Sequence, residues 1–263
     1  MAGQSIYFHG IPGGPGELTL FGEGLDTGHG DVHVVDRSNA KDWADADRYL
    51  QHLADAIRTQ FPDQPLRLIG FSLGASAALR TAPYLGLQVT GIDLISAAAP
   101  LTLGDYLGGM AGAPVFKLAR SWPTLFAGIV RLQSIAARLA SGKLYDALFA
   151  SAQGADLALS KDPAFKAAML SILQHSLGAG LSTYRREIAL YVEDWEDELG
   201  RVTPPVTLYH GTADNWSPVA MAQDLAGRLP NVAAVHLLDD LAHYSTLREY
   251  WRLYFTQPSP IVS

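Results

Sequence analysis

Ser72 lies in a Gly-X-Ser-X-Gly pattern, between an apolar strand-like run and a helix of small residues. This is the context of a nucleophile elbow, in which a sharp turn lifts the serine hydroxyl clear of the sheet. At the helix N-terminus, the Leu73 amide and the positive end of the helix can stabilise a developing oxyanion. The pattern predicts a Ser72 nucleophile with Leu73 in an oxyanion hole, and a purely structural turn is the alternative.

A glycine-rich loop, HGIPGGPG at residues 9–16, directly follows the first strand-like run. An amide at the end of this strand can converge with the Leu73 amide on one oxygen atom. Ile11 is the expected donor, because Pro12 has no N–H. A tight turn is one alternative. A phosphate cradle is another, but the lysine and the serine or threonine that a P-loop needs do not follow the glycines.

Asp214 and His243 each follow a strand-like run near the C-terminus. Taken singly, Asp214 would be a turn or cap residue and His243 a structural histidine. With Ser72 they follow the order Ser, Asp, His, each in a loop at the carboxyl end of a different strand. In such a triad the histidine accepts the serine proton, and the aspartate fixes the histidine tautomer.

The chain resembles the α/β-hydrolase superfamily over nearly its whole length, through HGIPGGPG at 9–16, GFSLG at 70–74, HGTAD at 210–214 and LAHYS at 241–245. The resemblance implies a Ser72 nucleophile, a His243 base held by Asp214, and oxyanion-hole amides from Leu73 and Ile11. The serine at the elbow separates the chain from the haloalkane dehalogenase and epoxide hydrolase branches, which place an aspartate there. Cofactor-independent ester cleavage is the expected reaction.

The strands that must hold these loops are predicted from apolar runs that alternate with helical patterns. Such alternation predicts an α/β fold with a mainly parallel sheet, whose ligands bind at the carboxyl ends of the strands. The first motif begins only nine residues from the start, so two N-terminal strands usual in the superfamily are expected to be missing. The six runs are Ser5–His9, Val32–Asp36, Leu66–Gly70, Val89–Ser96, Val206–His210 and Ala233–Leu238.

The alternation fails between about Leu101 and Gly200, where only helical patterns occur. This predicts a helical cap at residues 101–200, inserted into a hydrolase core of residues 1–100 and 201–263. Two amphipathic helices are expected in the cap. Their apolar stripes are Leu125, Ile129, Leu132, Ala136 and Leu139 in one helix, and Phe165, Met169, Ile172 and Leu173 after an Asp162 cap in the other.

Composition narrows the functional classes. The 263 residues include no Cys, which excludes disulfides, thiolate metal sites and cysteine nucleophiles. The net charge of −7 and the lack of a basic run argue against a nucleic-acid partner. No apolar stretch reaches the ~20 residues of a bilayer span, and no basic leader precedes the first strand. We expect a cytoplasmic monomer or homodimer acting on a small molecule, with no metal, no cofactor and no membrane partner.

The apolar side chains of the predicted cap favour an apolar acyl or alcohol group in an ester, thioester or lactone substrate. Trp216 and Phe71 are the expected substrate contacts. The wider apolar set is Phe126, Ile129, Val130, Leu148, Phe149, Phe165, Met169 and Trp216. Many reactions use this fold, so acyltransferase, lyase or oxygenase chemistry and a ligand-binding receptor remain alternatives.

Other polar residues offer weaker hypotheses. Asp105 is an alternative acid for the triad, and Asp239 and Asp240 are interpreted as loop residues. The acidic run at 193–198 is typical of a solvated helix face. However, the HGIPGGPG loop is similar to that of proline iminopeptidases, in which cap carboxylates hold a substrate amine, so an aminopeptidase is a further alternative. No metal-ligand spacing is found at His29, His33, His52, His175 or His236.

Overall fold

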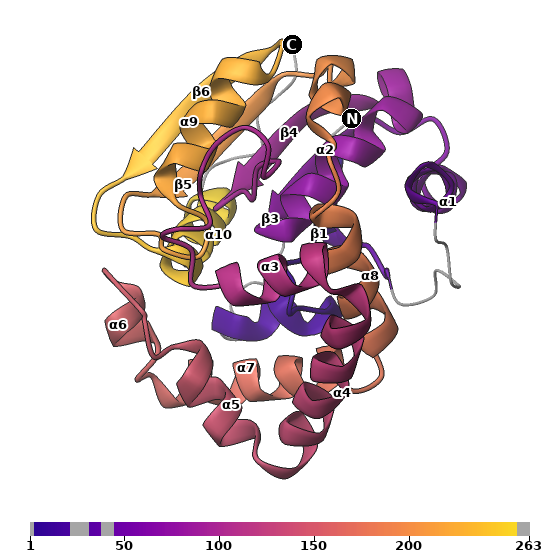
Figure 1. Cartoon of the computed structure of the whole chain (residues 1–263). Coiled ribbons are helices and arrows are strands. Elements are labelled where there is room, and N and C mark those ends of the chain that lie inside the picture. Colours follow the sequence, from indigo (N-terminus) through magenta and orange to yellow (C-terminus); the bar gives the residue numbers. More distant parts are fainter. Residues whose placement is uncertain (1–2, 22–31, 38–44, 257–263) are drawn as a thin grey trace.

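The structure, a computed structural model, describes residues 3–21, 32–37 and 45–256. Six strands form one parallel sheet in the order β2-β1-β3-β4-β5-β6, as Figure 1 shows in part. All six predicted strands are confirmed, with ends shifted by a residue or two. Their bounds are β1 Gln4–Phe8, β2 Val32–Val34, β3 Leu66–Phe71, β4 Val89–Ile95, β5 Val206–Gly211 and β6 Val232–Leu238.

Helices cover both faces of the sheet because successive residues of each strand point to opposite sides. In β1, Ile6 and Phe8 belong to a buried cluster shared with α1, α2 and α9, whereas Tyr7 packs in a second cluster with α10. The core therefore has two apolar layers, one on each side of the strands. These helices are α1 Ala46–Gln60, α2 Leu73–Leu85, α9 Val219–Arg228 and α10 His243–Thr256.

The chain between β4 and β5 is fully described and contains helices but no strand, as the sequence predicts. In Figure 1 most of these helices gather at the end of the sheet where the strands point. The segments are α3 Ala113–Ser121, α4 Pro123–Leu139, α5 Ser141–Leu148, α6 Asp156–Leu159, α7 Pro163–Ser176, α8 Leu181–Tyr191 and the 3₁₀ helix η4 Glu196–Arg201. Shorter 3₁₀ helices elsewhere are η1 Pro15–Phe21 and η3 Gly86–Gln88.

Helix α7 matches its prediction, since Asp162 caps it by accepting a hydrogen bond from the Phe165 amide and its expected apolar stripe is buried. Helix α4 forms where it was predicted, but its apolar stripe points outward, with Leu132 65% and Leu139 82% exposed. The inner face consists instead of Phe126, Val130, Ser134 and Ala137. Two of these four are small, which lets α4 pack closely against the helices beside it.

Candidate active site

Ser72 occupies the turn between β3 and α2. Its backbone has φ 55° and ψ −125°, in a region that L residues rarely adopt. The Ser72 amide donates to the Ile95 carbonyl at 3.0 Å, and the Ser72 carbonyl accepts from the Ala75 amide at 3.0 Å. These hydrogen bonds hold the strained turn, which is the conformation that the elbow pattern predicts.

Two glycines allow this turn to form. A Cβ on Gly70 would lie 2.6 Å from the Ala75 Cα, and a Cβ on Gly74 would lie 2.1 Å from the Phe8 carbonyl oxygen. Only glycine therefore permits this close approach of α2 to β3 and to the end of β1. The approach brings the start of α2, with the Leu73 amide, next to the loop that begins at His9.

Asp214 and His243 form a buried pair at the carboxyl ends of β5 and β6. His243 Nδ1 lies 2.9 Å from Asp214 Oδ2, and Asp214 Oδ1 accepts the Trp216 and Ser217 amides, each at 2.9 Å. Burial raises the pKa of the Asp214 carboxyl, but His243, His210 and the Ser217 amide together outweigh it and hold the pKa below its usual value. The ionised carboxylate fixes the proton on Nδ1 and leaves Nε2 as the basic nitrogen.

Aromatic rings and a hydroxyl hold His243 in place. The Trp216 ring stacks on the imidazole with 5.4 Å between the ring centroids. The Phe71 ring is tilted against the imidazole, with 4.8 Å between the centroids. The Ser96 hydroxyl donates to the His243 carbonyl at 3.3 Å. Phe71 is only 1% exposed and packs behind the imidazole, whereas Trp216 also faces the cavity described below. Of the two expected substrate contacts, Trp216 alone lines that cavity.

Asp156 of α6 fixes the start of α10, the helix that His243 opens. Its carboxylate accepts the Tyr244 amide at 3.0 Å and the Ser245 amide at 2.7 Å, and it is 2% exposed. A carboxylate at a helix N-terminus satisfies free amides and complements the helix dipole. No local sequence signal indicates this role of Asp156, because its partners are 88 and 89 residues away.

The glycine-rich loop begins beside the elbow, and Ile11 and Leu73 line the same cavity as Ser72. Two amides of the loop donate hydrogen bonds to side chains outside it. The Gly10 amide donates to Glu17 Oε2 at 2.9 Å, and the Gly13 amide donates to the Ser176 hydroxyl of α7 at 3.3 Å. The loop is therefore supported by its own following turn and by the helices between β4 and β5.

Glu17 is a buried carboxylate beneath the loop, 1% exposed, and the sequence analysis did not single it out. Its Oε2 also accepts the Tyr7 hydroxyl at 2.5 Å, while Oε1 has no hydrogen-bond partner. Burial raises the pKa of Glu17 to about 7, although the Tyr7 and Gly10 hydrogen bonds oppose the rise. The one sequence feature that could indicate this role is a single acidic residue between the glycine-rich loop and the apolar residues that follow it.

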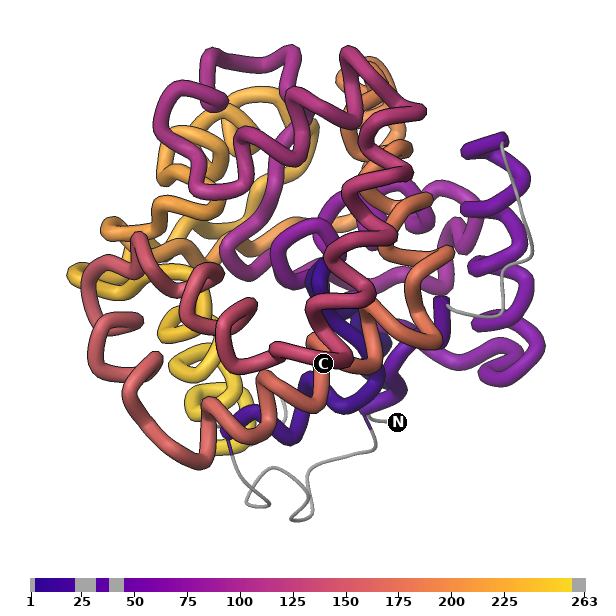
Figure 2. Tube along the Cα trace, turned by 60° about the horizontal axis from the view of Figure 1, so that its bottom comes forward, coloured from indigo at the N-terminus to yellow at the C-terminus, as the bar shows by residue number. Residues whose placement is uncertain are grey.

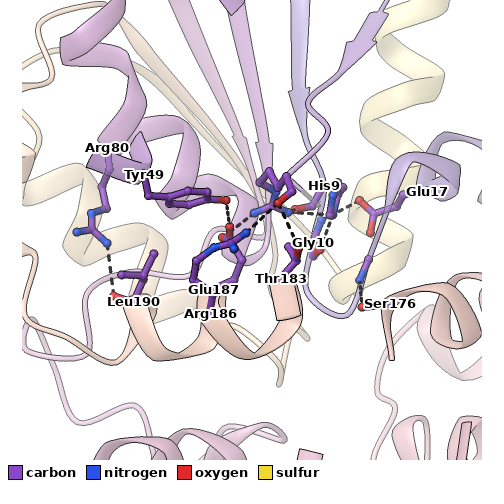
Figure 3. A network of polar contacts seen from close by, with 12 residues as sticks. His9, Gly10, Glu17, Tyr49, Arg80, Ser176, Thr183, Arg186, Glu187 and Leu190 are labelled. Carbon is purple, nitrogen blue, oxygen red and sulfur yellow. Dashed lines mark hydrogen bonds and ion pairs between the residues drawn. The ribbon is translucent and has the colours of Figure 1, made fainter. Parts of the chain in front are cut away.

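A second buried network ties the loop to α8, as Figure 3 shows. The Arg37 guanidinium donates to Glu187 at 2.8 Å, to His9 Nδ1 at 2.9 Å and to the His9 carbonyl, and the Tyr49 hydroxyl donates to Glu187. Burial, reinforced by the Arg37 charge, lowers the pKa of His9 well below its usual value. In its neutral form, His9 accepts a hydrogen bond from Arg37 and has a structural role in holding the loop.

A cavity of about 190 Å³ opens beside Ser72. Its wall is mostly apolar, and none of the lining side chains is acidic or basic. Of the eight residues in the wider apolar set, only Leu148 and Trp216 line it, because most of the others pack inside the protein. The lining residues are Ile11, Pro12, Ser72, Leu73, Ala111, Gly112, Val115, Phe116, Gln133, Leu144, Ala147, Leu148, Ser151, Leu173, Leu177, Tyr184, Ile188, Trp216 and Ser217.

The remaining candidates lie away from this cavity. Asp105 is exposed, and the carboxylate bonded to His243 is that of Asp214. In the acidic run, Glu198 pairs with Arg80 at 2.8 Å and Glu196 with Arg228 at 3.2 Å, so these carboxylates bind the chain itself. No cluster of metal-binding side chains occurs in the part of the chain that the structure describes, and His29 lies outside it.

The chain matches the family model Hydrolase_4, serine aminopeptidase S33, over residues 26–249. It belongs to this family. A search of curated protein sequences finds no match. Solved structures extend the comparison. An esterase from Exiguobacterium antarcticum is 17% identical, with a TM-score of 0.61, and the match covers 97% of this chain and 90% of that one.

Two further structures show how broadly the family fold is used. The esterase RhEst1 from Rhodococcus sp. ECU1013 is 18% identical, with a TM-score of 0.62 and coverage of 98% of this chain and 92% of that one. A bromoperoxidase from Bacillus anthracis is 14% identical, with a TM-score of 0.61 and coverage of 98% and 93%. The α/β-hydrolase fold is confirmed, but neighbours at this identity do not select a reaction.

Proposed function

We propose that the chain is a serine hydrolase that cleaves a carboxylic ester, thioester or lactone through an acyl-enzyme on Ser72. One observation carries the proposal: the strained Ser72 turn opens on a cavity that Trp216 and Ser217 also line, and these two residues contact the buried His243–Asp214 pair. No hydrogen bond joins the Ser72 hydroxyl to His243 within the described structure. Catalytic hydrogen bonds are often loose before substrate binds, so this geometry is compatible with the proposed roles.

The reaction has two halves. His243 Nε2 takes the Ser72 proton as the hydroxyl oxygen attacks the substrate carbonyl, and the protonated imidazole then gives that proton to the leaving alcohol or thiol. A water molecule next attacks the acyl-enzyme, His243 takes its proton, and Ser72 recovers a proton as the acid departs. Asp214 stabilises the imidazolium in each half.

The oxyanion of both tetrahedral intermediates would be held by the Ile11 and Leu73 amides, assisted by the N-terminus of α2. Both residues line the cavity beside Ser72. The Glu17 and Ser176 hydrogen bonds to the loop keep its backbone in place without contacting substrate. Preorganised donors of this kind each contribute roughly 10²–10³ in kcat.

The lining of the cavity supports a small, largely apolar acyl or alcohol group. The volume of the cavity limits the size of the group that it can hold. The absence of charged side chains in its lining disfavours a substrate that carries a free amine or carboxylate. The serine aminopeptidase description of the family favours a peptidase as the second candidate. Two carboxylates of the acidic run that could hold a substrate amine are instead paired with arginines, Glu198 with Arg80 and Glu196 with Arg228.

Hydrolysis of p-nitrophenyl esters from acetate to decanoate tests the proposal. We expect turnover with a preference for short or medium chains, and Ser72→Ala should reduce kcat by roughly 10⁶-fold. Ser151→Ala, which changes a hydroxyl on the same cavity wall, is the matched control and should stay within a few-fold of the parent. Release from amino-acid anilides without ester turnover would select the peptidase, and saturable ester binding without multiple turnover would select a receptor.

A further inference from the structure

Helix α4 carries apolar side chains on two opposite faces. Phe126, Val130 and Ala137 are buried, as described above. On the other face, Leu125, Leu132 and Leu139 recur every seven residues and so lie along one line of the helix. With their neighbours they form what we name the outer stripe: Trp122 (67% exposed), Leu125 (55%), Ile129 (37%), Leu132 (65%), Ile135 (52%) and Leu139 (82%).

The outer stripe stands apart from the rest of the described surface. Of the ten exposed large hydrophobic residues on the described surface, six belong to this one helix and its N-cap residue. The other four lie on three other elements, with one on η3, one on α6 and two on β6. Scattered exposed apolar residues are ordinary, but a contiguous set marks an interaction surface. Figure 2 shows the helices of residues 113–191 facing the viewer, with α4 among them, on the side of the molecule away from the sheet.

The charged side chains of the segment that carries the outer stripe are of one sign. Residues 106–145 contain no Asp or Glu, although the whole chain has a net charge of −7. Arg131 and Arg138 lie seven residues apart and follow one edge of the stripe. The basic residues of the segment, all exposed, are Lys117, Arg120, Arg131, Arg138 and Lys143. An apolar face beside a basic edge is typical of helices that lie in the headgroup region of a membrane.

We propose that the outer stripe docks on the surface of an anionic phospholipid membrane. The apolar side chains would enter the headgroup and acyl boundary while the arginines reach phosphates at its edge. A second copy of the chain fits less well, because a two-fold contact would bring together two segments with five cations each and no acid. No helix among the described residues is long and apolar enough to cross a membrane, so the mode proposed is peripheral.

The helix that carries the outer stripe also forms part of the wall of the candidate active site. Gln133 of α4, Val115 and Phe116 of α3 and Leu144 of α5 line the cavity from within. Docking through α4 would therefore place the cavity wall at the lipid surface, where apolar esters concentrate. This last step rests on the proposed function, whereas lipid binding is measured without any substrate.

Vesicle flotation tests the docking directly. The full chain is mixed with vesicles of phosphatidylcholine alone or of phosphatidylcholine with phosphatidylglycerol, at low and at high salt. We expect flotation with the anionic vesicles that weakens as salt screens the arginines. Replacing Leu125, Leu132 and Leu139 by serine should abolish flotation. Arg131→Gln and Arg138→Gln should each weaken binding roughly 5-fold, for about 1 kcal/mol per charge.

The matched control is Leu87→Ser, a fully exposed leucine on η3, which should float like the parent. Circular dichroism checks that each variant remains folded, and all substituted side chains are exposed. The proposal is overturned if the parent does not float with anionic vesicles, or if the serine variant floats equally well. A concentration-dependent dimer that the same substitutions dissociate would assign the stripe to self-association instead. Ester turnover without flotation would remove only this inference.

Discussion

The loops at the carboxyl edge of the sheet and the helices between β4 and β5 are held by different forces. In the loops, buried carboxylates bind specific backbone amides: Asp214 those of Trp216 and Ser217, and Glu17 that of Gly10. In the helices, broad apolar contacts predominate, and α4 belongs to the larger buried cluster through its inner face. Hydrogen bonds are directional and fix the positions of individual atoms to within tenths of an ångström. Apolar contacts are non-directional and fix only the shape of the surface that they form.

This difference explains what each region does. Acyl transfer needs a base, a nucleophile and two donors at set positions, and polar contacts supply that positioning. A cavity for an apolar substrate needs only shape and exclusion of water, which interchangeable apolar side chains provide. A single substitution in the loops should therefore mainly lower activity, whereas one in the helices should mainly lower the free energy of unfolding.

The largest expected effect tests the polar region. In Asp214→Asn, the side-chain oxygen can still accept from the Trp216 and Ser217 amides. The NH₂ group then faces the imidazole, where it cannot accept the Nδ1–H of His243. We expect kcat on the best ester to fall by about 10⁴-fold with the fold retained. The matched control is Asp105→Asn, at the exposed alternative acid, which should retain activity. A comparable loss in that variant would reassign the acid.

A second pair of variants tests the apolar region through the two faces of α4. Phe126 is 4% exposed and Leu132 is 65% exposed. Phe126→Ala leaves a cavity and should lower the free energy of unfolding by roughly 3–5 kcal/mol, whereas Leu132→Ala should change it by less than about 0.5 kcal/mol. Urea unfolding followed by circular dichroism measures both. Equal losses would mean that the outer stripe is part of the packed core.

The same contrast explains what the sequence predicts well. The strands and the Ser72, Asp214 and His243 loops were located because each motif is local: glycines, a turn and one functional residue within a few positions. Gly70 and Gly74 show the physical basis, since a side chain at either would collide with neighbouring backbone. Such steric requirements are written in the residue types themselves.

Long-range choices are harder to derive from sequence. Periodicity detects the apolar stripe of Leu125, Leu132 and Leu139, but α4 has a second stripe, and only its neighbours decide which is buried. Asp156 gives no local signal, because it caps a helix that begins far along the chain. The cap boundaries at 101–200 and the catalytic roles stay predictions, since a fold does not itself define a reaction.

The smallest expected effect returns to the polar region through Glu17. Because burial raises the pKa of this carboxyl from 4.5 to about 7, the folded protein keeps a proton that the unfolded chain releases over this range. Unfolding then releases a proton, so stability falls as pH rises from about 4.5 to about 7 and is level outside that window. Relative to Glu17→Gln, the parent should lose roughly 3 kcal/mol across it, at 1.36 kcal/mol per pKa unit.

Urea unfolding of both proteins at intervals between pH 4 and pH 8 measures this difference. Tyr7→Phe sharpens the test, because the Tyr7 hydroxyl donates to Glu17 and lowers its pKa. Losing that donor should extend the fall in stability to higher pH. Parallel profiles for the parent and Glu17→Gln would mean that the folded state holds Glu17 with an ordinary pKa, as an ionised acceptor for the Gly10 amide. The Gly10 amide would then be held by an ionised carboxylate, as the Trp216 and Ser217 amides are held by Asp214, rather than by a neutral carboxyl.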